Sequence, residues 1–180
     1  MGLAAPAVLV LGACSGPSTP EVGRAGEADL RDALLGLGAA VDPVEAGRAA
    51  EVAYALMPQL VAAYQITDPP LIHNTKVNMG IKPRGLCWHW AEDTERRLRE
   101  ENFATLDVHR AIANHDNARI DHSTAIVSAR GAQMFDGVVL DGWRHGGRLF
   151  WSLVQEDKRY DWRPQAEVLA IYAEREKRRR

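Results

Sequence analysis

The stretch Lys82-Pro83-Arg84-Gly85-Leu86-Cys87-Trp88-His89-Trp90 is a breaker-rich loop that leads directly into an amphipathic segment. Pro83 and Gly85 disfavour helix before Leu86, whereas most residues up to position 101 are good helix formers. We therefore expect a helix over residues 86–101, with Cys87 in its first turn. Unpaired N–H groups and the positive end of the helix dipole stabilise a thiolate there, which predicts a lowered pKa for Cys87 and a usable nucleophile. A free cysteine is more often a small hydrophobic core residue, so other parts of the chain must distinguish the two interpretations.

The composition is that of a soluble globular domain. The chain has 180 residues, of which 46% are hydrophobic and 26% are charged, enough for one ordinary core. Its net charge of -2 provides no general attraction for nucleic acid or an anionic membrane, so we expect no nucleic-acid partner. The basic run at residues 175–180 is typical of a solvated chain end.

The amino-terminal part has the features of an export signal. Residues 4–13 form an apolar run that is shorter than the ~20 residues of a transmembrane helix but is typical of a signal-peptide core. Leu11-Gly12-Ala13-Cys14 resembles the lipobox of bacterial lipoproteins, whose cysteine is lipidated, and residues 15–20 resemble a flexible tether. No Lys or Arg precedes Cys14, so either the start is placed too late or this is an ordinary chain end. The lipobox predicts a lipid-anchored protein on the periplasmic side of a bacterial cell envelope; without it, the protein would be cytoplasmic.

The cysteine count supports a reactive role for Cys87. Cys14 and Cys87 are the two cysteines of the chain, and lipidation of Cys14 would leave Cys87 as a lone thiol. Without lipidation, a disulfide between them is the alternative, although it would tie the helix to the chain end. We predict a signal and tether over residues 1–26 and a single domain over residues 27–180.

Apolar periodicity predicts two helices before the cysteine. Residues 27–37 form the first, and residues 43–64 form the second with Asp42 as its N-cap. Pro58 is expected to bend or interrupt the second helix. Residues 67–84, rich in proline, are expected to form a long loop that contributes a wall of a cleft, into which Asn74 or Asn78 can reach.

The second half of the chain is predicted to form an antiparallel sheet and a last helix. Strands are expected at residues 103–112, 120–130 and 135–141, a further strand or short helix at 149–151, and a helix at 164–177. A two-residue type II′ turn at Gly131-Ala132 would fix the pairing of the two central strands. In that register His122 lies directly opposite Asp141 on the same face, with Cβ atoms about 5 Å apart.

Cys87, His122 and Asp141 then supply a nucleophile, a base and a group that orients the base. His89 is not the expected base because it projects well away from Cys87 around the helix. A Cys-x-His metal pair lacks the further ligands that zinc needs, so we expect no metal and no cofactor.

The motifs Gly85-Leu86-Cys87-Trp88, residues 121–127 and residues 138–143 resemble the transglutaminase-like branch of the papain-like cysteine hydrolases. The resemblance implies an α+β fold in which N-terminal helices precede a cysteine-bearing helix packed on an antiparallel sheet, with a C-terminal helix. It also implies a catalytic triad of Cys87, His122 and Asp141. The backbone N–H of Cys87 can supply one oxyanion donor, and the second donor is unassigned.

Two functions follow from this site. The first is a cysteine-dependent amide or ester hydrolase or acyl transferase, namely a peptidase, an amidase or a transglutaminase-like enzyme, that forms a thioester intermediate. Its substrate would be a peptide or another amide-bearing molecule, and a cell-wall peptide if the protein is exported. Trp88, Trp90 and Trp143 are expected to rim the cleft and contact substrate. The second function is a non-catalytic lipoprotein that binds a partner in the same cleft.

Overall fold

The computed structural model describes residues 26–117 and 121–179, which form an α+β fold. Within these residues a five-stranded antiparallel sheet has the order β4-β3-β2-β1-β5. The strands are β1 (Leu106–Ala113), β2 (His122–Ala129), β3 (Val138–Asp141), β4 (Phe150–Leu153) and β5 (Arg163–Pro164). The helices are α1 (Glu27–Leu35), α2 (Pro43–Ala63), α3 (Pro70–Asn78), α4 (Cys87–Arg99) and α5 (Gln165–Lys177). The predicted fold class is confirmed.

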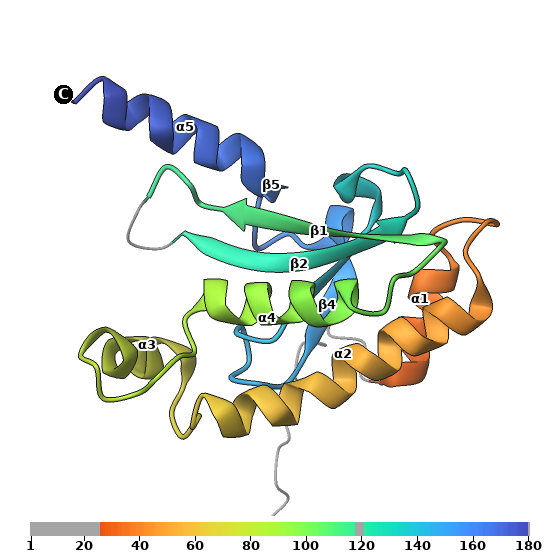
Figure 1. The fold of residues 1–180 in the computed structure, drawn as a ribbon, viewed down its shortest axis with the longest axis horizontal. Helices are drawn as coiled ribbons and strands as arrows, with labels where there is room; N and C mark the ends of the chain where they lie inside the picture. Colours follow the sequence, from red (N-terminus) through yellow and green to blue (C-terminus); the bar gives the residue numbers. More distant parts are fainter. Residues whose placement is uncertain (1–25, 118–120, 180) are drawn as a thin grey trace, which may run out of the picture.

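Helix α4 lies between the sheet and α2 (Figure 1). It packs mainly across β2 and β1, while α1 packs on α2. The main core fills the space between these helices and the sheet and contains Trp90 and Val127. A smaller core on the other face of the sheet contains Ile126 and Trp162. Side chains alternate between the two faces of a strand, and consecutive residues of β2 are buried, so both faces of β2 are covered. This packing holds its first residue, His122, in place.

The start of α2 agrees with the prediction. The Asp42 carboxylate accepts hydrogen bonds from the N–H groups of Val44 at 2.8 Å and Glu45 at 3.0 Å, as an N-cap should. The predicted interruption at Pro58 is wrong, because α2 is one continuous helix through it. The buried side chains on either side of the proline, such as Met57 and Leu60, pack this part of the helix onto the core.

The predicted long loop over residues 67–84 is only partly correct. It contains helix α3, which begins at Pro70 with Pro69 as its N-cap residue. A proline breaks the interior of a helix but is compatible with its first turn, where its missing N–H would have no helical partner. The two adjacent prolines therefore start a helix here.

The predicted hairpin is also corrected. In the structure Ala125 pairs with Leu140, whereas the predicted register places Ala125 opposite Val138. The connection between β2 and β3 is longer than a two-residue turn, because Met134–Asp136 form a short 3-10 helix and Met134 is buried in the smaller core. The register is therefore shifted by two residues. A two-residue shift preserves the face on which each side chain lies, so Asp141 still projects on the same side as His122.

Candidate active site

Cys87 is the first residue of α4, which agrees with its predicted place in the first turn, although Leu86 is the N-cap residue instead of the first helical residue. Gly85, with a φ of +125°, turns the chain into the helix. The N–H groups of Gly85 and Leu86 both donate to Nδ1 of His89, each at 3.1 Å. His89 therefore acts as a cap for the helix that carries Cys87, and burial lowers its pKa. This role is consistent with its exclusion as the catalytic base.

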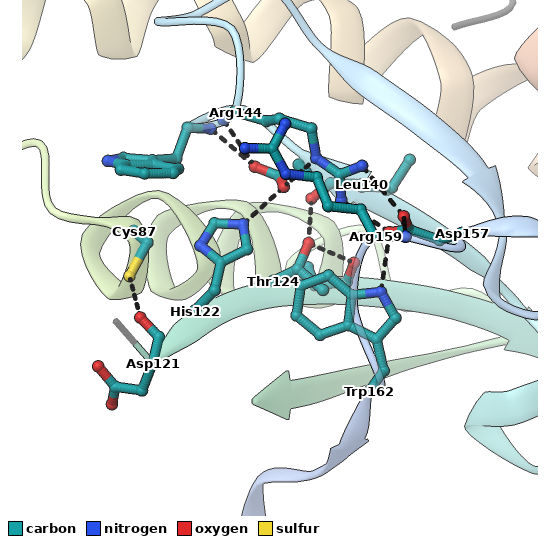
Figure 2. Close-up of polar contacts among 12 residues, drawn as sticks. Cys87, Asp121, His122, Thr124, Leu140, Arg144, Asp157, Arg159 and Trp162 are labelled. Atoms are coloured by element: carbon teal, nitrogen blue, oxygen red, sulfur yellow. Dashed lines mark hydrogen bonds and ion pairs between the residues drawn. The ribbon is translucent and has the colours of Figure 1, made fainter. Parts of the chain in front are cut away.

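His122 and Asp141 form a buried pair. Nε2 of His122 lies 2.7 Å from Oδ2 of Asp141, and the two side chains are 3% and 1% exposed. Because a carboxylate only accepts hydrogen bonds, Nε2 carries a hydrogen in this pair. The other ring nitrogen, Nδ1, is left on the side of Cys87 (Figure 2).

The side chain of Cys87 lies near enough to His122 to act on the pKa of its imidazole. Burial alone would lower the pKa of His122, but the Asp141 carboxylate and then Cys87 outweigh burial and raise it to about 9. The cationic form of the imidazole is thus stabilised beside the sulfur. The Cys87 Sγ also lies 3.7 Å from the backbone carbonyl oxygen of Asp121, which a thiol proton can reach. The structure therefore brings the three predicted residues together.

Four hydrogen bonds hold the Asp141 carboxylate. Its Oδ2 accepts from His122 and from Nε of Arg144 at 3.0 Å, and its Oδ1 accepts from the backbone N–H groups of Trp143 at 3.0 Å and Arg144 at 2.9 Å. Burial raises the pKa of Asp141, but the neighbouring imidazole and guanidinium outweigh it, so its pKa falls below the usual range. Asp141 is therefore an ionised, fixed acceptor.

Aromatic rings enclose the imidazole of His122. Its ring centroid lies 4.5 Å from that of Tyr160, 4.9 Å from that of Trp143 and 5.5 Å from that of Trp162. These contacts restrict rotation of the ring and exclude water from the bond to Asp141.

The three tryptophans predicted to contact substrate have different positions. Trp88 is 44% exposed, beside Cys87. Trp143 is partly buried and donates through Nε1 to Oδ1 of Asn74 at 3.0 Å, so a side chain of α3 bonds a ring that packs on His122. Trp90 cannot rim a cleft, because it is 2% exposed. It stacks edge-on against Tyr64 in the core, which corrects the prediction for Trp90.

Sequence reasoning missed three residues that contact the triad and a fourth, Asp157, that binds two of those three. They are Arg144, Asp157, Tyr160 and Trp162. Arg144 and Asp157 carry no motif, and their partners are defined only when the turn after β3 folds back beside the segment before β5.

The described part of the chain contains no group of three or more His, Cys, Asp and Glu side chains that could hold a metal ion. The predicted lipidation site, Cys14, lies outside the described residues. No protein-family model matches the chain, and no curated protein or solved structure is significantly similar to it.

Proposed function

We propose that the protein is a cysteine-dependent acyl-transfer enzyme, acting on amides or esters through Cys87, His122 and Asp141. The observation that carries the proposal is the buried 2.7 Å bond between Nε2 of His122 and Asp141, which leaves Nδ1 for the cysteine at the start of α4. A nucleophile, a base and a group that orients the base are thereby assembled from α4, β2 and β3. The resemblance to transglutaminase-like enzymes supports the same chemistry.

The reaction proceeds in two halves. Nδ1 of His122 takes the thiol proton, and the sulfur of Cys87 attacks the carbonyl carbon of the substrate. The helix start offers the backbone N–H of Cys87 to the developing oxyanion, because the first N–H groups of a helix have no helical acceptor. The carbon–nitrogen or carbon–oxygen bond then breaks, the leaving group takes the proton from His122, and a thioester to Cys87 results.

In the second half, His122 takes a proton from the acceptor as that acceptor attacks the thioester carbon. Water as acceptor gives a carboxylic acid, and an amine gives a new amide. In both cases the carbon–sulfur bond breaks and the proton returns from His122 to Cys87. Trp88, the residue after Cys87 in α4, is 44% exposed and offers an apolar surface near the helix start for a peptide or another amide-bearing substrate.

Alkylation of Cys87 tests the function. Iodoacetamide should alkylate Cys87 in the folded protein near neutral pH, and the His122→Gln variant should react about 100-fold more slowly because the thiol loses its base. The rate constant is measured by mass spectrometry of the intact protein. Cys87→Ala shows whether the label is confined to Cys87, and 4-nitrophenyl acetate should release a burst of nitrophenolate from the wild type.

The matched control is His109→Gln. His109 is bonded to Ser128 instead of Cys87, so its replacement should leave the alkylation rate unchanged. A thiol that reacts only after unfolding, or equal rates for the wild type and His122→Gln, would show that Cys87 is structural and would favour the non-catalytic binding module.

Lipidation of Cys14 is proposed together with a location on the cell envelope, where cell-wall peptides would be accessible as substrates. No helix among the described residues is long and apolar enough to cross a membrane. The full-length protein, produced in a bacterial host from an upstream-extended start, should partition into the detergent phase of a Triton X-114 extraction. Cys14→Ser should move it to the aqueous phase, whereas Cys87→Ser should not. A wild type found entirely in the aqueous phase would contradict lipidation.

A further inference from the structure

A buried chain of ion pairs continues beyond Asp141 and has no part in the chemical steps described above. Nε of Arg144 bonds Oδ2 of Asp141 at 3.0 Å, and its two terminal nitrogens bond Asp157 at 2.7 and 3.2 Å. The side chains of Arg144 and Asp157 are only 4% and 2% exposed. Figure 2 shows the contacts that join Arg144 to Asp157. Such a fork fixes the position of the arginine in a way that one contact cannot.

Asp157 is also connected to His122 through Trp162 and not only through Arg144 and Asp141. Nε1 of Trp162 donates to Oδ2 of Asp157 at 3.0 Å, and the Trp162 ring lies 5.5 Å from the imidazole of His122. Tyr160 contacts both His122 and Arg144: its ring centroid is 4.5 Å from that of His122 and 4.8 Å from the guanidinium carbon of Arg144. Asp157 therefore acts, through Arg144, on the Asp141 carboxylate that accepts from His122, and directly on Trp162, which packs near the His122 ring.

The charges along this chain balance only when His122 is protonated. Asp141 and Asp157 are anions and Arg144 is a cation, so an imidazolium at His122 leaves these four side chains with no net charge, and the Cys87 thiolate at the helix start carries the remaining negative charge. The imidazolium is the form that His122 takes after it removes the thiol proton. A neutral buried group is favoured where water cannot screen the charges.

We propose that Arg144 and Asp157 are positioning residues of the triad. Asp157 holds Arg144, Arg144 holds Oδ2 of Asp141 against the imidazole, and neither residue contacts the reacting atoms. The catalytic consequence of this proposal rests on the proposed function. The position and charge of the imidazole do not depend on that function, so they can be measured separately.

Asp157→Asn is the most direct test. The asparagine keeps the shape of the side chain and can still accept from Trp162, but it removes the charge that balances Arg144. The turnover number with 4-nitrophenyl acetate should fall about 10-fold or more with little change in KM, because small displacements of a catalytic group are costly. The pKa of His122, measured by NMR titration in a Cys87→Ser background, should fall, because an unbalanced Arg144 weakens the hold of Asp141 on the imidazolium.

The groups that face His122 must be assigned in the same titration, because each of them affects it. They are Cys87 of α4, Asp121 next to His122 in the chain, Asp141 of β3 with Arg144 behind it, and Tyr160 from the segment before β5. The Cys87→Ser background removes the thiol from this set, and the remaining groups are the same in each variant compared.

Asp107→Asn is the matched control. It removes a carboxylate from another ion pair, with Arg130, at 2.8 Å. Asp107 pairs with Ser128, six residues along β2 from His122, or about 20 Å at the rise of a strand. This variant should lose some stability and leave both the turnover number and the pKa of His122 unchanged.

A second variant covers the case in which Asp157→Asn does not fold. Arg144→Lys keeps the cation but cannot bridge two carboxylates, so turnover should fall about 10-fold while the pKa of His122 stays close to that of the wild type. If a folded Asp157→Asn or Arg144→Lys variant behaves like Asp107→Asn, the positioning role is overturned. If Asp157→Asn shifts the pKa of His122 but the wild type shows no acyl transfer, the link between Asp157 and His122 is supported and the proposed function is contradicted.

Discussion

Replacement of Asp141 by asparagine should lower acyl transfer by about 10³- to 10⁴-fold while leaving the protein folded. The reason lies in the hydrogen bonds around the carboxylate. Two backbone N–H groups, from Trp143 and Arg144, bond Oδ1. An asparagine must place its oxygen there, because its amide nitrogen cannot accept. The amide NH₂ is then directed at Nε2 of His122.

This reversal changes the tautomer of the histidine. In the wild type Nε2–H donates to Asp141, so Nδ1 is the nitrogen that takes the thiol proton of Cys87. In Asp141→Asn the side-chain amide donates to Nε2, which favours the tautomer with a hydrogen on Nδ1. That nitrogen can no longer take the proton of Cys87, and the imidazolium also loses the anion that stabilises it. The expected loss is therefore in kcat, measured with 4-nitrophenyl acetate, with circular dichroism as the check on folding.

Asp136→Asn is the control for this experiment. Asp136 is an exposed residue in the 3-10 turn before β3 and should change the rate by less than about 2-fold. If Asp141→Asn retains a tenth or more of the wild-type rate, Asp141 does not orient the base and the triad assignment is wrong.

Replacement of Gly85 by alanine should cost about 3 to 5 kcal/mol of the free energy of unfolding, the sum of two separate effects. Its φ of +125° is a conformation that residues with a side chain rarely adopt. A Cβ at this position would also lie 2.4 Å from Nε2 of His73. His73 cannot move aside easily, because it is 1% exposed and Nε2 is bonded to the carbonyl of Arg84 at 2.8 Å.

Gly80→Ala separates the two effects in the same urea-unfolding measurement. Gly80 has a φ of +74°, but no atom lies within 4 Å of the position that its Cβ would take. Its substitution should therefore cost only the backbone strain, about 1 to 2 kcal/mol. Equal losses for Gly85→Ala and Gly80→Ala would show that the contact with His73 does not constrain the start of α4.

The sequence identified the components of the site because local rules govern them. Pro83 and Gly85 act on their own backbone, so the helix start at Cys87 could be predicted within one residue. The face shared by His122 and Asp141 could be predicted although the register was wrong, because strand side chains repeat every two residues and the error was two residues. A one-residue error would have separated the pair.

Other features depended on residues far apart in the chain. Trp90 and Trp88 are near neighbours in sequence, yet one packs against Tyr64 in the core and the other faces solvent, because α2 covers only one side of α4. The bond between Trp143 and Asn74 spans 69 positions, and no local pattern indicates it.

Local conformational preferences, set by a residue and its near neighbours, thus determined from the sequence alone where α4 begins and on which face the histidine and the aspartate project. Only the tertiary structure decided what holds the Asp141 carboxylate in place. Arg144 becomes its partner because the turn after β3 buries the guanidinium against Asp157, and a buried charge requires a partner that only packing can supply.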